Sequence, residues 1–155
     1  MIYVIAALMG TEIAAYFDLD GTILDASSEK TLTAHLAIRR PWRIPIGTTM
    51  WSLGFIGNLI RGRSLYDAAR NRGHFALASW DVLEQYSRKL AKEELIQKVP
   101  QIALDRLQWH REQGHRLVLV TATIAPMAEA MARELGMDQV YGCGPNIRQG
   151  IMSGS

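Results

Sequence analysis

Apolar runs of two kinds alternate along this chain and predict a sheet interrupted by a helical segment. Short runs that stop at polar residues or glycine are typical of buried strands, whereas longer 3.6-periodic runs are typical of helices. The predicted strands span residues 13–17, 116–121 and 139–141. The predicted helices span residues 28–38, 44–60, several segments of 64–99, 100–112 and 126–135. This order of helices and strands favours a parallel α/β sheet with right-handed crossovers.

Proline and glycine mark where several of these helices begin and end. Pro41 should stop the first helix, and Pro100 and Pro126 should each open one. Gly114 and Gly136 stand where the last two helices should close.

Residues 44–60 read IPIGTTMWSLGFIGNLI and contain no charge. A membrane-spanning helix needs about 20 predominantly apolar residues, and this run is shorter and includes three glycines. We therefore interpret it as a buried helix of an inserted subdomain. Peripheral membrane contact stays open as the alternative, because Arg43 and Arg61 flank the run.

The composition limits the chain to one sizeable core with an insertion. The chain has 155 residues, 48% of them apolar, and a formal net charge of +2, which does not argue for nucleic acid. Between Thr31 and Tyr66 there is no acidic residue but there are five arginines, so this segment is locally basic. Cys143 is the single cysteine. A disulfide framework and a zinc site are therefore not expected, and a reducing, cytoplasmic compartment fits.

The first predicted strand ends in the sequence AYFDLDGTILD, residues 15–25. Two carboxylates, Asp18 and Asp20, stand directly before Gly21. The strand 116–121 delivers a hydroxyl residue, Thr121, to the same edge, because ligands of open parallel sheets bind beyond the carboxyl ends of the strands. Gly21 would allow backbone N–H groups to approach an anion, and the Thr22 hydroxyl could hold the turn. This arrangement suits a phosphoryl group with a divalent cation.

The sequence FDLDGT after an apolar strand resembles the DxDGT signature of the haloacid dehalogenase superfamily. LVLVTAT, about 100 residues later, is similar to its second motif. The helical insertion and the phrase FDLDGTILDASSE resemble most the phosphoserine-phosphatase-like branch. The resemblance implies a Rossmann-like core at residues 1–24 and 100–155, with a helical cap inserted at residues 25–99.

The resemblance also implies roles for individual residues. Asp18 would form an aspartyl-phosphate, and Asp20 would act as general acid and base. Substrate phosphate would be bound by Gly21, Thr22, Thr121 and Ala122. Mg²⁺ would bind the Asp18 carboxylate and the Asp20 backbone carbonyl.

The sequence also departs from the family pattern. The family's third motif is a lysine and its fourth an adjacent acidic pair, but no lysine follows Lys98, and the acidic residues beyond Thr123 are isolated from one another. The family's sheet also continues with further strands, so we expect strand 13–17 to leave one edge unpaired. The strand before the aspartates needs only the residues from about Glu12 onward, so no role is predicted for residues 1–11. We expect a truncated chain; a natural short protein, either completed by a partner or no longer catalytic, is the alternative.

Two functions therefore stay open. The first is a magnesium-dependent phosphomonoester hydrolase that acts on a small phosphorylated metabolite through an aspartyl-phosphate. The second is a catalytically incomplete relative that docks through its basic, apolar cap on a membrane or a partner. The substrate and the oligomeric state are not indicated by the sequence.

Overall fold

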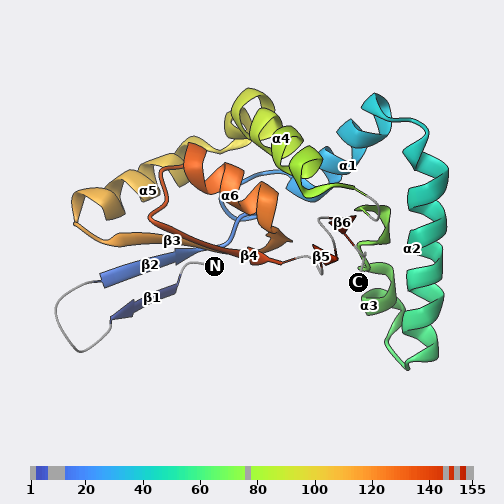
Figure 1. Ribbon diagram of the computed structural model, residues 1–155. Coiled ribbons are helices and arrows are strands. Elements are labelled where there is room, and N and C mark those ends of the chain that lie inside the picture. Colours follow the sequence, from blue (N-terminus) through green and yellow to red (C-terminus); the bar gives the residue numbers. More distant parts are fainter. Residues whose placement is uncertain (1–2, 7–12, 76–77, 145–146, 149–150, 153–155) are drawn as a thin grey trace. The chain divides into compact units, whose positions relative to one another are not determined.

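The computed structural model describes residues 3–6, 13–75, 78–144, 147–148 and 151–152. The chain divides into two compact units, each described here by itself (Figure 1). The sheet unit comprises Met1–Glu29 and Glu84–Gly144, and the helical unit comprises Lys30–Leu83 and Pro145–Ser155. Two helices, α1 and α4, continue from one unit into the other.

A four-stranded sheet in the order β1-β2-β3-β4 forms the base of the sheet unit. Strands β2 (Ile13–Phe17), β3 (Arg116–Ile124) and β4 (Gln139–Cys143) are parallel, which confirms the predicted α/β class. In their register, Leu119 of β3 lies between Phe17 of β2 and Val140 of β4. Each of the three strands was expected from its apolar run, although β3 is longer than predicted.

Strand β1 (Tyr3–Ala6) corrects the expectation of an unpaired edge on β2. It runs antiparallel to β2, with Tyr3 opposite Tyr16 and Ala6 opposite Ile13. Since β1 donates and accepts ladder hydrogen bonds along β2, the N-terminal segment is part of the sheet. The sequence alone indicated no role for these residues.

Helices α5 (Gln101–Glu112) and α6 (Ala125–Glu134) lie on one face of the sheet (Figure 1). Both end as predicted at glycine, each with the paired backbone hydrogen bonds of a Schellman motif. Arg111 on α5 donates to the carbonyl oxygens of Leu135 (3.2 Å) and Gly136 (3.3 Å), and so caps the end of α6.

The core of the sheet unit lies between this face and the two helices. The strands contribute Phe17, Leu117 and Leu119, and the helices contribute Leu107, Met127 and Met131, all nearly fully buried. Full burial of one such side chain contributes roughly 1.5–3 kcal/mol. These contacts fix β2 and β3 side by side and so place their carboxyl ends together.

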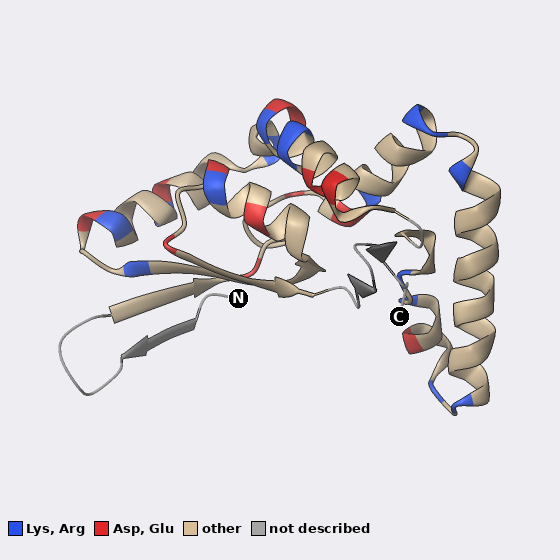
Figure 2. Cartoon of the chain, in the orientation of Figure 1, with Lys and Arg blue, Asp and Glu red and all other residues tan. Residues whose placement is uncertain are grey.

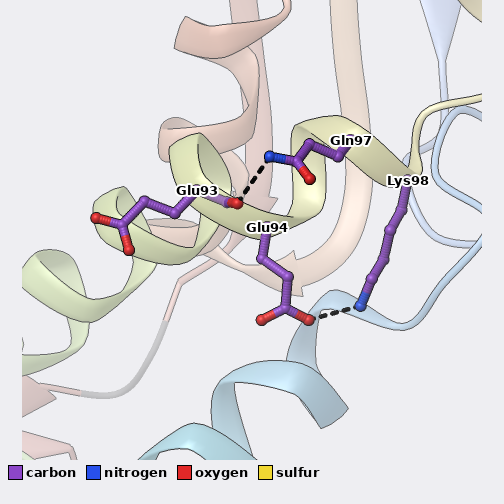
Figure 3. Close-up of polar contacts among 4 residues, drawn as sticks. All are labelled: Glu93, Glu94, Gln97 and Lys98. Carbon is purple, nitrogen blue, oxygen red and sulfur yellow. Dashed lines mark hydrogen bonds and ion pairs between the residues drawn. The ribbon is translucent and has the colours of Figure 1, made fainter.

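A short helical segment connects α4 (Trp80–Leu90) to α5. It consists of a π-helical turn, η2 (Ala91–Leu95), and a 3₁₀ turn, η3 (Ile96–Lys98). Gln97 donates to the carbonyl oxygen of Glu93 (3.1 Å), and Lys98 pairs with Glu94 (2.6 Å), as Figure 3 shows. Both contacts are exposed, and an i,i+4 side-chain pair such as Lys98 with Glu94 contributes only about 0.2–0.5 kcal/mol. Burial of Ala91 and Leu95 therefore stabilises this segment more.

The helical unit contains most of α1 (Ser28–Arg39), then α2 (Arg43–Ile60), α3 (Leu65–Ala69), the 3₁₀ turn η1 (Gly73–Phe75) and the start of α4. A two-stranded hairpin, β5 (Ile147–Arg148) with β6 (Ile151–Met152), is also assigned to this unit. The predicted helix at 28–38 is confirmed as α1, with the N-terminal serine that was expected.

The expectation that residues 44–60 form a buried helix is wrong. They do form a helix, α2, but among its residues only Arg43 and Gly47 are buried, while Leu53 is 58% and Ile60 is 81% exposed. Among the described elements, α3 and η1 make the main contacts with α2, and they leave many of its apolar side chains exposed. Figure 2 shows α2 without charge along its length and with basic residues at its ends. No described helix is long and apolar enough to cross a bilayer.

Candidate active site

Asp18 is the first residue after β2, and its side chain is exposed. The residues on either side of it, Phe17 and Leu19, are buried to 3% and 0% exposure. Phe17 also packs edge to face against the ring of His110, at 5.5 Å between ring centroids. The strand is therefore anchored on both sides of a carboxylate that faces solvent.

The chain turns directly after Asp18, as the pair of carboxylates suggested. The carbonyl oxygen of Leu19 accepts from the N–H groups of Thr22 (3.3 Å), Ile23 (3.1 Å) and Leu24 (2.9 Å). Gly21 donates its N–H to Leu24 (2.8 Å) and has a φ of 75°, a conformation that L side chains rarely adopt. The N–H groups of Gly21 and Thr22 thus close the turn here, and binding of phosphate by these two residues stays a prediction.

Asp20 points back from this turn into a hydrogen-bonded network. Its two carboxylate oxygens accept from the N–H of Ser28, at 3.1 and 3.2 Å. The hydroxyl of Thr123 lies 3.5 Å from one of them, at the limit of a hydrogen bond, and 3.3 Å from the hydroxyl of Ser28. Asp20 is therefore held in one orientation by the start of α1 and the end of β3, whereas Asp18 is left open.

Thr121 lies one step further along the same network. Its hydroxyl donates to the Thr123 hydroxyl (3.1 Å) and accepts from the Thr123 N–H (3.1 Å). Both threonines are buried, at 8% and 3% exposure, while Ala122 between them is exposed. The sequence predicted that β3 ends at Thr121, but β3 continues to Ile124 with an irregularity in its pairing to β4. Thr123, rather than Thr121, is the threonine next to Asp20.

Glu29 connects the network to α6. Its carboxylate accepts from the N–H of Ile124 (2.9 Å), the residue that caps the N-terminus of α6. A carboxylate is favourable at this position because it meets both an unpaired N–H and the positive end of the helix dipole.

Three of these residues were not assigned to the site from the sequence. Ser28 and Thr123 contact Asp20, and Glu29 contacts the start of α6. Thr123 lies beyond the predicted strand 116–121, and Ser28 and Glu29 lie at the start of the predicted helix 28–38. The spacing Thr-Ala-Thr was the available signal for Thr123, because residues i and i+2 of a strand share a face. Glu29 carried no such signal, since Ile124 lies 95 residues away, and neither did the contact of the Ser28 hydroxyl with Thr123, which spans the same distance along the chain.

The free oxygen atoms at this edge fit a magnesium ion shared with a phosphate. Asp18 offers an exposed carboxylate, and none of the backbone hydrogen bonds that close the turn uses the carbonyl oxygen of Asp20. Mg²⁺ in phosphate-handling sites is usually held by one or two carboxylates together with water and substrate oxygens. Within the described part of the chain, no three His, Cys, Asp or Glu side chains gather in one place. The described donor set is therefore minimal.

Three comparisons place this chain among known proteins. A model of the haloacid dehalogenase-like hydrolase family matches residues 15–155. No curated protein matches significantly. Several solved structures share the fold, although their sequence identities are low.

A protein of unknown function from Bordetella pertussis Tohama I has 22% identity and a TM-score of 0.66, with 89% of this chain and 63% of that chain covered. A HAD family hydrolase from Salmonella enterica serovar Typhi has 13% identity and a TM-score of 0.56, with 88% of this chain and 42% of that chain covered. A probable phosphoserine phosphatase from Vibrio cholerae has 12% identity and a TM-score of 0.52, with 90% of this chain and 39% of that chain covered.

The chain thus spans less than two thirds of the length of each of these three structures. The family model, in contrast, covers both strand ends that carry the aspartates and threonines of the site. The match extends over most of the sequence, and the parallel sheet and the turn after β2 agree with it. The chain belongs to the haloacid dehalogenase-like hydrolase family.

Proposed function

We propose that this chain carries the nucleophile and the general acid of a magnesium-dependent phosphomonoester hydrolase. The observation that supports this most is the different environment of the two aspartates. Asp18 is exposed at the end of β2, and Asp20 is held by the Ser28 N–H and the Thr123 hydroxyl. One carboxylate is thus open for attack, and the other is oriented for proton transfer.

In the first step, a carboxylate oxygen of Asp18 attacks phosphorus while the bond from phosphorus to the leaving oxygen breaks. Asp20 gives its proton to that oxygen, so the alcohol leaves and Asp18 carries the phosphoryl group. The Thr123 hydroxyl suits both charge states of Asp20, because a hydroxyl can rotate to donate to a carboxylate or accept from a carboxylic acid.

In the second step, water attacks the phosphorus of the aspartyl-phosphate. Asp20, now ionised, takes a proton from this water, and inorganic phosphate leaves with the Asp18 carboxylate restored. The Asp18 carboxylate and the Asp20 carbonyl would hold the magnesium ion, which when bound supplies positive charge against the phosphoryl oxygens. The Thr121 hydroxyl donates to the Thr123 hydroxyl in this structure. When phosphate is bound, it is a candidate donor to a phosphoryl oxygen instead.

In the family pattern, the lysine of the third motif supplies the positive charge that screens the phosphate from the carboxylate nucleophile. This sequence has no lysine in the expected place. No lysine follows Lys98, and the Lys98 ammonium pairs with Glu94 at 2.6 Å. We therefore expect slow turnover by this chain alone. The proposed substrate class is a small phosphomonoester. The proposed compartment is the cytoplasm, because a single cysteine suits a reducing environment.

The experiment is magnesium-dependent release of phosphate from p-nitrophenyl phosphate. Asp18→Asn should abolish release, whereas Asp81→Asn, an exposed aspartate of α4, should leave it unchanged. Intact-mass spectrometry of quenched wild type should detect one added phosphoryl group, absent in Asp18→Asn. If wild type and Asp18→Asn release phosphate at the same rate, the nucleophile is assigned wrongly.

A second function, docking on an anionic membrane surface, is favoured by the exposed apolar side of α2 and by the basic segment around it. Arg39 and Arg40 would contribute to it, but Arg43 is only 8% exposed and so is a poor surface contact. No turnover in either aspartate variant or wild type, together with salt-sensitive flotation on anionic vesicles, would place this function first.

A further inference from the structure

An open pocket of about 620 Å³ lies between α2 and α3 of the helical unit. This volume is within the range of small-molecule sites. Its charged lining consists of Arg61, Arg63, Arg70, Arg72 and Asp67. Four guanidinium groups against one carboxylate give the lining a strong positive excess.

The backbone fixes two of these arginines on either side of Gly62. The N–H of Arg63 donates to the Asn58 carbonyl (3.1 Å), and the N–H of Gly62 donates to the Leu59 carbonyl (2.9 Å), which together form a Schellman motif. Gly62 has a φ of 76°, as this motif requires. Arg61 and Arg63 thus leave a rigid helix end, and both side chains start from fixed positions.

The opposite wall of the pocket is equally well ordered. Ser64 caps α3 by accepting from the N–H of Asp67 (3.1 Å), and its hydroxyl donates to the Asp67 carboxylate (2.6 Å). Arg70 donates to the hydroxyl of Tyr66 (3.2 Å) and lies over its ring, at 5.3 Å from the centroid. The one carboxylate in the lining is thereby engaged by the helix cap.

Asn71 ties this wall to α2. Its side-chain amide donates to the carbonyls of Ala68 (2.9 Å) and Trp51 (3.2 Å) and accepts from the N–H of Gly73 (3.0 Å). The pocket lining therefore includes a buried, hydrogen-bonded amide at Asn71, while Arg61 and Arg63 are exposed at its rim.

Two arginines of the rim are open to solvent. Arg61 and Arg63 are exposed, and no carboxylate of the described residues forms an ion pair with either. Like charges held together destabilise a folded unit unless a counter-ion joins them. Guanidinium groups bind phosphate oxygens through paired N–H donors. We propose that this pocket binds a phosphate-bearing anion, with Arg61 and Arg63 as its principal ligands.

This inference rests on the helical unit alone and not on the proposed hydrolase activity. The test uses the full chain, inorganic pyrophosphate as probe, EDTA to remove magnesium, and constant ionic strength. Isothermal titration should give a dissociation constant that the double variant Arg61→Gln/Arg63→Gln weakens at least about tenfold, because two charge-assisted contacts are lost. Arg39→Gln, an exposed arginine outside the pocket, removes one charge and should change the constant less than twofold.

Asp18→Asn separates this proposal from the proposed function. Pyrophosphate affinity in EDTA should be retained in Asp18→Asn, even though that variant should lose hydrolysis. Affinity lost in Asp18→Asn but retained in Arg61→Gln/Arg63→Gln would place the anion at the strand ends and would overturn the proposal.

The phosphate group could belong to a soluble metabolite or to a lipid headgroup. Flotation with vesicles of phosphatidylcholine, with and without phosphatidate, distinguishes the two sources. Binding only to phosphatidate vesicles, lost in Arg61→Gln/Arg63→Gln and kept in Arg39→Gln, assigns the pocket to a headgroup; pyrophosphate binding with the same dependence assigns it to a soluble anion. Equal effects of Arg61→Gln/Arg63→Gln and of Arg39→Gln on binding would overturn the proposal. The absence of binding both to pyrophosphate and to phosphatidate vesicles would overturn it as well.

Discussion

At the scale of the residue, Thr123 carries the hydroxyl that joins the end of β2 to the end of β3. It lies 3.5 Å from the Asp20 carboxylate and accepts from Thr121 at 3.1 Å. The longer of these contacts is weak, so the Ser28 N–H is the firmer partner of Asp20. Thr123 is 3% exposed, so its hydroxyl contacts Asp20 from within the core.

Thr123→Val keeps the shape of this side chain and removes its hydroxyl. The Thr121 hydroxyl then loses its acceptor in a buried place, which should lower the free energy of unfolding by about 1–3 kcal/mol. Phosphate release should fall by about tenfold, since one donor that orients Asp20 is lost. Chemical denaturation and steady-state kinetics measure the two effects.

Thr123→Ser is the matched control, because it restores the hydroxyl without the methyl group. It should recover most of the activity lost in Thr123→Val. Equal activity of the two variants would show that the Thr123 hydroxyl does not orient Asp20.

At the scale of the element, the approach of η1 to α2 depends on one glycine. A Cβ built on Gly73 would lie 2.6 Å from the carbonyl oxygen of Met50 and 2.6 Å from the N–H nitrogen of Trp51. Both are backbone atoms of α2 and cannot move aside without shifting the helix. Gly57, further along α2, has no atom within 4 Å of such a Cβ.

These two glycines should therefore respond in opposite directions to the same substitution. Gly73→Ala should lower the free energy of unfolding by about 1–3 kcal/mol through steric overlap. Gly57→Ala should raise it by about 0.5–1 kcal/mol, because alanine restricts the unfolded chain and favours the helix. Urea denaturation of both variants checks the pair, and a loss of stability in both would contradict the packing of η1 on α2.

At the scale of the whole molecule, each unit contains a histidine whose pKa is lowered mainly by burial. Burial, with a smaller contribution from Arg72, lowers the pKa of His74 in the helical unit. Burial, together with His115 and Arg106, lowers the pKa of His110 in the sheet unit. The Nδ1 atoms of His110 and His115 lie 2.9 Å apart, so one must accept the proton that the other donates.

The molecule should consequently lose stability in mild acid. A histidine whose pKa is lower in the folded than in the unfolded state takes up its proton more readily when unfolded, so its contribution is present above pH about 6.5 and is lost as pH falls below that value. Each histidine can change the free energy of unfolding by at most about 1.4 kcal/mol per pH unit. Urea denaturation at pH 7.5 and pH 5.5 measures this change.

His110→Gln and His74→Gln are the variants that test the cause. Each should reduce the difference in unfolding free energy between the two pH values, and the double variant should reduce it further. An unchanged pH dependence in the double variant would show that other groups cause the acid sensitivity.

Sequence patterns predicted the parallel strands, the ends of α5 and α6 and the family. They failed for β1 and for the burial of α2. The apolar run of residues 44–60 suggested burial. An apolar composition shows that a helix can be buried, but it does not show how many other helices or strands pack against it. The strand β1 was missed because a short apolar segment has no periodicity to separate it from other N-terminal segments.

The sequence by itself determined local features: the glycines at which α5 and α6 end, and the two aspartates and glycine that follow an apolar strand. These depend on residues a few positions apart, and their physical causes are backbone sterics and side-chain periodicity. Only the tertiary structure decided that Thr123 lies beside Asp20, 103 residues away, and that four arginines line one pocket. Such contacts form when strands pair and helices pack, because packing joins surfaces whose distance along the chain leaves no local pattern.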